Sequence, residues 1–335
     1  MSSFSIGLLI VLAGAVMQGS WALPQKFVRG WAWEKMWLLY SVAAMIVFPW
    51  LFVSLMIPRA GEAYASVSTG VLVRTALFGA GWGLGSVLFG LGIAAVGLAL
   101  GFAIIISLTA ALGTLVPMAI LHPERFTFQR GGLLILGLLV VIAGVSLCAK
   151  AGAIKDAGAS ATKGNFTRGL LICIASGIAS PMFNFGFAFG TPIQSQAVKL
   201  GANEDYASIA LLAVITTAGF VVNAGYCVYL LVRNRSWAKG LNTDRFRNLG
   251  CATAMGFMWL LGFFLYGIGS SPTRMGPLGS SVGWAILMTT MVLVANVWGL
   301  LTGEWKNVEK RAFRYLGGGL ALLVVALVAI GLSSN

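Results

Sequence analysis

The feature that most constrains this chain is the regular return of long apolar stretches. Ten segments of about 18 to 25 mainly apolar residues recur along it, and a helix of that length crosses a hydrocarbon layer of roughly 30 Å. The predicted limits are 4–23, 37–57, 75–95, 97–119, 131–149, 169–190, 206–232, 249–270, 278–302 and 316–332. The sequence therefore predicts an all-α integral membrane protein with ten transmembrane helices.

Composition excludes an ordinary water-soluble domain. Of the 335 residues, 59% are hydrophobic and 9% are charged, and the mean hydropathy is +0.91, whereas about a quarter of the residues of soluble domains are charged. The longest polar connections, around 150–168 and 233–248, are too short to form a soluble domain. We expect no cleaved signal peptide, because residues 1–20 lack a basic start and run into Trp21 and Pro24 without a small-residue cleavage site.

The basic residues are distributed unequally between the two sides of the predicted membrane. The odd-numbered connections hold Lys26, Arg29, Lys35, Lys150, Lys155, Lys163, Arg168, Arg233, Arg235, Lys239, Arg245, Arg247, Lys306, Lys310, Arg311 and Arg314. The even-numbered connections hold Arg59, Arg74, Arg125, Arg130, Lys199 and Arg274. Because cytoplasmic loops carry the excess of Lys and Arg, both termini are expected outside the cytoplasm. The net charge of +13 thus reflects topology and contact with anionic lipid head groups, and we expect no nucleic-acid partner.

An internal repeat suggests two halves of opposite orientation. Residues 82–92 read WGLGSVLFGLG and residues 259–269 read WLLGFFLYGIG, so that Trp82 matches Trp259 at an offset of 177. Five spans separate the two copies, and an odd number of crossings inverts the second copy. We therefore expect a first five-helix repeat in residues 1–150, a cytoplasmic linker in 151–168 and a second five-helix repeat in 169–335.

Inverted halves are typical of carriers, in which a site at their interface faces the two sides in turn. The chain has no paired carboxylates, no histidine cluster and no phosphate-binding glycine loop, so we expect neither an enzyme nor a cofactor. The four cysteines show no CxxC spacing, and His122 is the single histidine. We therefore expect no metal site, with the cysteines serving as packing residues.

The middle of the spans carries neutral polar groups instead of charges. All nine acidic residues lie in connections or at span ends, whereas amides, hydroxyls and indoles lie inside the spans. Aromatic faces beside neutral hydrogen-bonding groups suit a neutral polyol. The candidate substrate-binding residues are Gln18, Trp82, Asn184, Asn223, Trp259, Tyr266 and Trp284. Each also has a structural alternative, since amides in helix bundles often bond a neighbouring backbone and tryptophans often anchor at the interface.

Several motifs resemble one family of transporters over essentially the whole chain. They are Pro24-x-Lys26, Trp31-x-Trp33-Glu34-x-x-Trp37, Pro49-Trp50, Phe78-Gly79-Ala80-x-Trp82-Gly83-x-Gly85, Met258-Trp259 and Gly303-Glu304-Trp305-Lys306. They are similar to the L-rhamnose–proton symporter family of the drug/metabolite transporter superfamily. The resemblance implies ten helices in two inverted halves, and import of L-rhamnose or a related 6-deoxy sugar with protons across a bacterial inner membrane.

If protons drive uptake, a carboxylate near a span end must gain and lose a proton during the cycle. Glu34 is the first candidate for that proton-coupling residue and Glu304 is the second; an ion pair with a nearby lysine or arginine is the alternative for Glu34. Pro24 is expected to end or kink the first helix, and Lys26 to anchor it near a gate. Two other functions stay open at this point: a carrier of the same fold for another neutral metabolite, working as an exporter or uncoupled facilitator, and a membrane sensor that transports nothing.

Overall fold

The computed structural model describes the chain except for residues 1, 126–127, 156–165, 239–242, 307 and 334–335. The first half holds α1 (Ser3–Ser20), η1 (Leu23–Phe27), α2 (Trp33–Val42), η2 (Ala43–Val47), α3 (Phe48–Met56), α4 (Ala60–Ala65), α5 (Thr69–Val96), α6 (Leu98–Leu121), η3 (Pro123–Arg125) and α7 (Phe128–Lys155). The second half holds α8 (Phe166–Ala179), α9 (Met182–Phe189), α10 (Thr191–Lys199), α11 (Ser208–Arg233), α12 (Arg245–Gly269), α13 (Pro272–Met275), α14 (Gly279–Leu301) and α15 (Lys310–Ser333). The described residues contain no strand, which confirms the all-α prediction.

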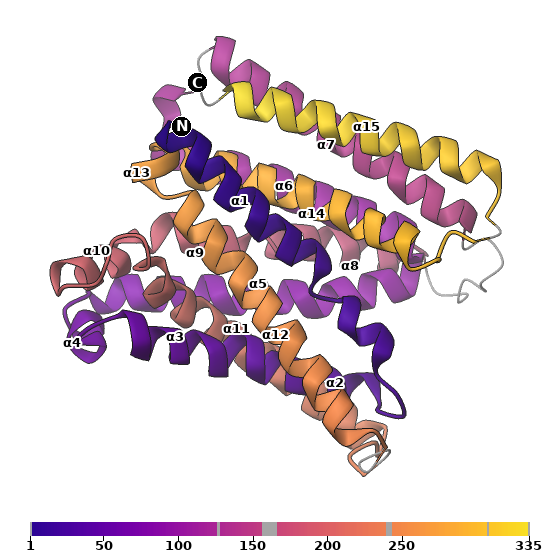
Figure 1. Cartoon of the computed structure of the whole chain (residues 1–335), viewed down its shortest axis with the longest axis horizontal. Helices are drawn as coiled ribbons and strands as arrows, with labels where there is room; N and C mark the ends of the chain where they lie inside the picture. The colour runs from indigo at the N-terminus through magenta and orange to yellow at the C-terminus, as the bar shows by residue number, and fades with distance from the viewer. Residues whose placement is uncertain (1, 126–127, 156–165, 239–242, 307, 334–335) are drawn as a thin grey trace.

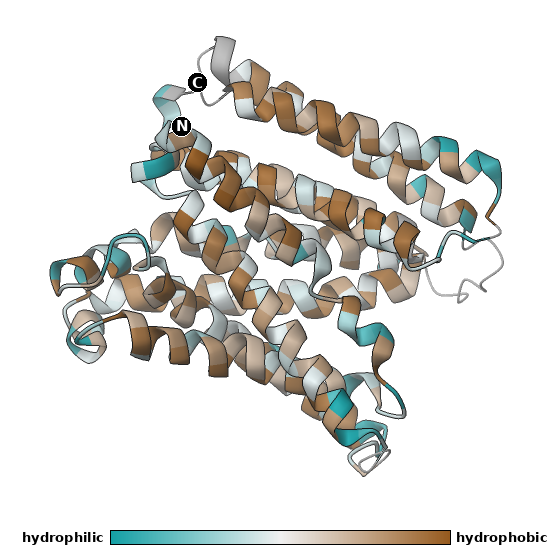
Figure 2. Cartoon of the chain, viewed as in Figure 1, coloured by the Kyte–Doolittle hydropathy of each residue, from teal (hydrophilic) through white to brown (hydrophobic). Residues whose placement is uncertain are grey.

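The number of spans is also confirmed. Ten helical stretches among the described residues are long and apolar enough to cross a membrane. In Figure 2 the hydrophobic residues follow the middle of the helices, and the hydrophilic residues gather at the helix ends on two opposite sides. This distribution is the one that a hydrocarbon layer between two aqueous faces requires. The chain is therefore described below as a multi-pass membrane protein.

Two spans are interrupted, and both interruptions occur beside proline. The second span consists of α2, a π-helical turn in η2 and α3, and Pro49 follows directly in the first turn of α3. The sixth span breaks at Ser180 and Pro181, where α8 ends and α9 begins. Proline lacks an N–H for the helical ladder, and π turns are a common way to absorb such a break. Both spans therefore bend inside the membrane.

Other connections are as short as the sequence indicated. Gly97 alone separates α5 from α6, and its φ of +91° belongs to a region that residues with a side chain rarely adopt. The helix α1 ends at Ser20, and Pro24 lies in the first turn of the 3₁₀ helix η1. The predicted linker at 151–168 begins inside α7 and ends inside α8, and its middle part, 156–165, lies outside the described residues.

The ten spans form a compact bundle with one separate pair at its edge. Figure 1 shows α7 and α15 side by side along that edge, and α1 packed across α12 and α14. Both termini lie at the same end of the molecule, as an even number of crossings requires.

Close approach of several helices depends on glycine. A Cβ added at Gly79 of α5 would lie 2.2 Å from the backbone oxygen of Ile215 on α11, and one at Gly262 of α12 would lie 2.9 Å from the backbone oxygen of Gly14 on α1. Helices in a bilayer gain little hydrophobic energy from association, so such backbone contacts are a main source of packing energy. The crossings of α5 and α12 with their neighbours therefore fix the centre of the bundle.

Candidate functional site

A cavity of about 700 Å³ lies at the centre of the bundle. Its size falls in the range of about 300–1,000 Å³ that is usual for small-molecule sites. The spans that contribute to its wall are the first to fourth, the seventh to ninth and the break of the sixth at Ser180. Of the seven substrate-binding candidates, the structure brings five to this wall: Gln18, Trp82, Asn223, Trp259 and Trp284.

The cavity extends toward one face of the molecule only. On that face the wall reaches Trp33 at the start of α2, Ala94 near the end of α5 and Leu230 near the end of α11. In the other direction it ends at the rings of Trp82 in the middle of α5, Phe263 in the last third of α12 and Trp284 in the first third of α14. The face that the cavity approaches carries the odd-numbered, basic connections.

Aromatic rings form the inner end of the cavity. The rings of Trp82 and Trp259 stack with their centroids 5.4 Å apart and their planes 27° apart. Phe183 packs against both tryptophans, at 5.1 Å from Trp82 and 5.9 Å from Trp259. Phe263 lies 4.8 Å from Trp259, and Trp284 lies 6.4 Å from Phe263. The result is a continuous aromatic floor, defined as Trp82, Trp259, Phe263 and Trp284, against which a solute with an apolar face can stack.

Two amides stand at the wall among these rings. The Nε2 of Gln18 donates to the backbone oxygen of Trp259 at 2.7 Å, which leaves Oε1 without a hydrogen bond from any described residue. The Oδ1 of Asn223 lies 3.5 Å from Nε1 of Trp37 and 3.4 Å from Oγ of Ser86. Those two contacts are at the outer limit of hydrogen-bond length. Both amide oxygens can therefore accept a hydrogen bond from a solute hydroxyl.

The remaining two candidates, Asn184 and Tyr266, do not reach the cavity. The hydroxyl of Tyr266 contacts Oδ1 of Asn184 and the backbone oxygen of Ser280, and Nδ2 of Asn184 donates to the backbone oxygen of Gly113 at 2.8 Å. The two side chains therefore form hydrogen bonds with each other and with backbone oxygens, which for Asn184 is the structural alternative named above. They join α6, α9, α12 and α14 beyond the aromatic floor, on the side where the cavity is closed.

A row of aromatic side chains on the second span contributes to the wall and was not among the candidates. Trp33 and Trp37 stack at 5.0 Å, Trp37 lies 5.2 Å from Tyr40, and Tyr40 stacks on Trp21 at 4.8 Å. All four residues line the outer part of the cavity. A signal was present in the sequence, because residues 33, 37 and 40 share one face of a helix. Aromatic residues near a span end favour the interfacial interpretation instead.

Glu34 is a buried carboxylate next in sequence to Trp33, which lines the cavity. Its side chain lies in the first turn of α2 and is 7% exposed. Its Oε1 accepts hydrogen bonds from Oγ of Ser236 and, at 3.1 Å, from Nδ2 of Asn234, both of which follow α11. Trp33 and Trp37 flank it on the same helix and line the cavity. A change in the protonation of Glu34 would therefore alter the hydrogen bonds that join α2 to the segment after α11.

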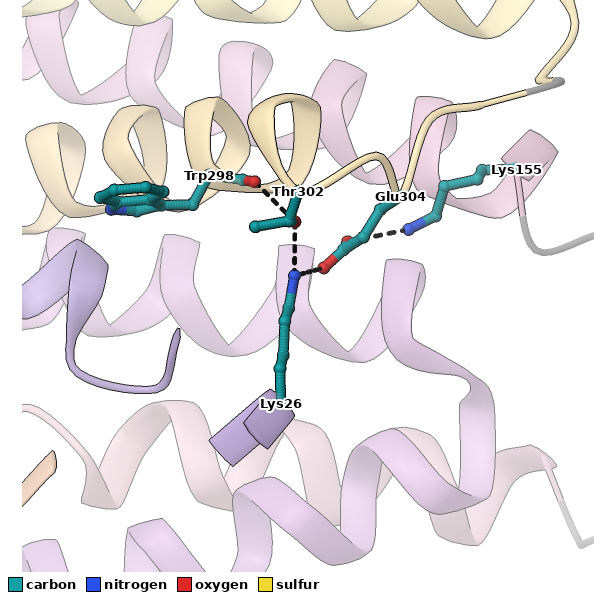
Figure 3. A network of polar contacts seen from close by, with 5 residues as sticks. All are labelled: Lys26, Lys155, Trp298, Thr302 and Glu304. Atoms are coloured by element: carbon teal, nitrogen blue, oxygen red, sulfur yellow. Dashed lines mark hydrogen bonds and ion pairs between the residues drawn. The ribbon is translucent and has the colours of Figure 1, made fainter. Parts of the chain in front are cut away.

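Glu304 has a different environment, made of two lysines (Figure 3). Its Oε1 pairs with Nζ of Lys26, and its Oε2 lies 3.4 Å from Nζ of Lys155. Lys26 also donates to Oγ1 of Thr302 at 2.6 Å, and Thr302 donates to the backbone oxygen of Trp298 at 2.7 Å. The hydrogen bond from Lys26 lowers the pKa of Glu304, and the charge of Lys155 acts in the same direction. We refer to Lys26, Glu304 and Lys155 as the lysine clasp; it ties η1 and α7 to the segment after α14.

The described residues form ten apolar helices, and eight of these spans enclose a solute-sized cavity that reaches one face; this arrangement is typical of a membrane transport protein. Comparison with known proteins identifies the family. The family model described as L-rhamnose-proton symport protein (RhaT) matches residues 1–335, and the chain belongs to that family.

Curated relatives share almost their whole length with the chain. The L-rhamnose-proton symporter of Citrobacter koseri is 29% identical over 344 residues, covering 99% of both proteins. The L-rhamnose-proton symporter of an Escherichia coli strain is 29% identical over 347 residues, again covering 99% of both. That of Cronobacter sakazakii is 30% identical over 347 residues, covering 100% of this chain and 99% of the relative. These relatives are named as symporters, which are transporters and not enzymes, in agreement with the sequence prediction.

The lysine clasp predicts a dependence of stability on pH. A carboxylate whose pKa is lowered by folding contributes stability above its unfolded pKa, and that contribution is lost as the pH falls through the folded value. We expect wild-type protein in detergent to be more thermostable than Glu304→Gln at neutral pH and the two to converge in acid. The difference should be no more than about 1 kcal/mol, because Lys26 and Glu304 are 39% and 40% exposed.

Glu62→Gln is the matched control, since Glu62 pairs with Arg59 at a position 60% exposed and within one turn of the chain. It should change the unfolding temperature less than Glu304→Gln at neutral pH. A constant difference between wild type and Glu304→Gln from neutral to acid pH would contradict the assignment.

Proposed function

We propose that this chain carries L-rhamnose, or a closely related 6-deoxy sugar, together with protons across a bacterial inner membrane. The observation that carries the proposal is the family match over residues 1–335, supported by relatives named L-rhamnose-proton symporter along their whole length. A carrier of this kind needs a solute site that can face each side in turn and a group that carries the proton. The central cavity and Glu34 are our assignments for these two parts.

The chemistry of the cavity fits a neutral sugar. No charged side chain lines it in the part of the chain that the structure describes. The aromatic floor can stack on the C–H face and methyl group of a 6-deoxy sugar, while amide oxygens accept from its hydroxyls. We assign sugar contacts to Trp82, Trp259 and Trp284 on the floor and to Gln18 and Asn223 on the wall.

Corresponding contacts in the two halves support an inverted repeat. At the offset of 177, Gly79 of α5 corresponds to Gly256 of α12. A Cβ at Gly79 would lie 2.2 Å from the backbone of Ile215 in the seventh span, and one at Gly256 would lie 2.6 Å from Cβ of Ala43 in the second span. The second and seventh spans are themselves five apart, so each glycine meets the equivalent helix of the other half.

Two further glycine pairs at the same offset also contact equivalent helices of the two halves. Cβ atoms at Gly92 and Gly269 would lie 2.7 Å from Sγ of Cys173 on α8 and 2.6 Å from the backbone oxygen of Gly7 on α1. A Cβ at Gly85 would lie 2.7 Å from the backbone nitrogen of Ser180, at the break after α8. A Cβ at Gly262 would lie 2.7 Å from Nε2 of Gln18 on α1. The first and sixth spans are thus equivalent too. Trp82 and Trp259 stack where α5 and α12 face each other, as expected near a twofold axis.

The orientation of the chain follows from its basic connections. The positive-inside rule places them in the cytoplasm and both termini in the periplasm. The cavity then faces the cytoplasm, and the cluster of Tyr266, Asn184 and Ser280 closes the periplasmic side. Alkaline phosphatase fused after Asn335 should be active in cells, and the same reporter fused after Arg233 should be inactive. The opposite pattern would reverse the assignment of the two faces.

Transport is tested with purified protein in proteoliposomes. Labelled L-rhamnose should accumulate when the outside is made acidic relative to the lumen, and a protonophore should abolish that accumulation. Uptake that persists after the proton gradient is removed would indicate an uncoupled facilitator, and absence of any flux would favour a sensor. Accumulation of a different neutral solute in preference to L-rhamnose would assign another substrate.

Variants of the aromatic floor connect this flux to the cavity. Trp82→Ala and Trp259→Ala should each lose most L-rhamnose binding, because each removes a stacking surface, while membrane insertion stays normal. Trp237→Ala is the matched control, since Trp237 lies in an exposed connection and is 51% exposed. Wild-type affinity in both floor variants would place the sugar elsewhere.

Glu34 is our proposal for the residue that carries the proton. Burial makes an ionised carboxylate costly, whereas the hydroxyl of Ser236, the amide of Asn234 and the charge of Lys35 favour it. The lysine clasp, in contrast, keeps Glu304 ionised, which suits an anchoring role for Glu304 and Lys26 better than a titrating one. We therefore rank Glu34 above Glu304, and we assign Lys26 and Pro24 to the fixed end of the first span.

Substitution of Glu34 should separate coupling from binding. Glu34→Gln removes the titrating group but keeps its size, so accumulation driven by a proton gradient should be lost while exchange of labelled for unlabelled L-rhamnose continues. Glu62→Gln, on an exposed carboxylate outside the cavity, should leave both activities unchanged. Normal proton-driven accumulation by Glu34→Gln would exclude Glu34 as the coupling residue.

A further inference from the structure

Thr109 occupies a position on the cavity wall that the proposed contacts do not use. It lies in the middle of α6, and its side chain is 4% exposed. Within the described part of the chain, its hydroxyl oxygen has no hydrogen-bond partner. Threonines in helices usually donate to the carbonyl four residues earlier, as Thr217 and Thr289 of this protein do at 2.7 Å. Thr109 does not, and its hydroxyl oxygen has less than 1 Å² of accessible surface in this conformation, so a solute in the cavity meets it after rotation about the Cα–Cβ bond.

Thr109 differs from the other buried side chains with an unsatisfied atom. Several hydroxyls in the described residues lack a partner, among them those of Thr75, Thr114 and Thr290. Thr109 is the member of that group whose residue also lines the central cavity. An unpaired buried hydroxyl is unfavourable. A solute hydroxyl in the cavity would remove that penalty.

The neighbouring indole fixes the position of Thr109. Nε1 of Trp284 donates to the backbone oxygen of Thr109 at 3.0 Å. Gly113, one turn further on, makes room for the ring, since a Cβ there would lie 2.2 Å from Nε1 of Trp284. The indole N–H and the carbonyl are thereby both occupied. A sugar stacked on the aromatic floor beside Trp284 would thus find the Thr109 hydroxyl as the hydrogen-bonding group of this part of α6.

Thr109 and Gln18 lie at opposite ends of the floor. Gln18 is bonded to the backbone of Trp259, Trp259 packs on Phe263, Phe263 packs on Trp284, and Trp284 is bonded to Thr109. Polar groups at both ends of an apolar surface match a solute whose ring has hydroxyls at its edge and C–H groups on its face.

We propose that the Thr109 hydroxyl is a specificity-determining contact that binds one hydroxyl group of the transported sugar. The proposal deepens the function proposed above and rests on it. Valine has nearly the shape of threonine but no hydroxyl, so Thr109→Val keeps the packing of the wall and removes the hydrogen bond. Serine keeps the hydroxyl.

The experiment measures L-rhamnose affinity of the full-length protein by calorimetry in detergent. Thr109→Val should weaken binding about tenfold, the usual order for one hydrogen bond to a neutral group, and Thr109→Ser should stay within about threefold of wild type. Thr114→Val is the matched control, because Thr114 lies on the same helix, is 0% exposed and also lacks a described partner, yet does not line the cavity. Its affinity should equal that of wild type.

Deoxy analogues of the sugar identify the partner hydroxyl. The analogue that lacks the hydroxyl bound by Thr109 should bind wild type about tenfold more weakly than L-rhamnose does. Thr109→Val should bind this analogue and L-rhamnose with nearly equal affinity. Thr109→Ala serves as a second hydroxyl-free variant if the valine protein does not fold. Equal affinity of wild type and a folded hydroxyl-free variant for L-rhamnose would overturn the inference alone. Wild-type protein that binds no L-rhamnose would instead refute the proposed function, and the inference with it.

Discussion

Close backbone contact at glycines on α5 and α12 is the constraint on which the rest of the structure depends. In a bilayer, burial of apolar side chains contributes little to helix association, because the lipid is also apolar. Van der Waals contact between closely approaching backbones is therefore a main source of packing energy. Gly79, Gly85 and Gly92 bring α5 against the seventh and sixth spans, and Gly256, Gly262 and Gly269 bring α12 against the second and first. With the two helices held in this way, Trp82 and Trp259 have to meet, and their stacked rings form the inner end of the cavity.

The fold could largely be predicted from the sequence because hydropathy reports directly on membrane crossing. The number of spans followed from length and composition, even where Gly97 alone separates two of them. The interruptions of the second and sixth spans were harder to foresee. Pro49 and Pro181 mark them, but whether proline kinks a helix, ends it or produces a π turn depends on which neighbours can take over the freed backbone groups.

The candidate site was predictable only in part, because hydropathy does not say which way a side chain points. Trp82 and Trp259 could be found through their repeat, and Gln18 and Asn223 through their polarity inside a span. Asn184 and Tyr266 have the same polarity, but they bond each other and the backbone away from the cavity. Trp37 and Thr109 line the cavity and were not selected, since an interfacial tryptophan and a helical threonine are both ordinary. Only the packing of spans distant in sequence distinguishes these cases.

The row of tryptophans has an optical consequence. Six of the eleven tryptophans, Trp21, Trp33, Trp37, Trp82, Trp259 and Trp284, line the cavity from its mouth to its inner end. Indole emission shifts in wavelength with the polarity and mobility of its surroundings, so water displaced from this passage changes the light that the protein emits. In the proposed function, a sugar that moves between the floor and the mouth passes a different tryptophan at each stage, so the emission of the protein itself can report occupancy of the cavity without an attached label.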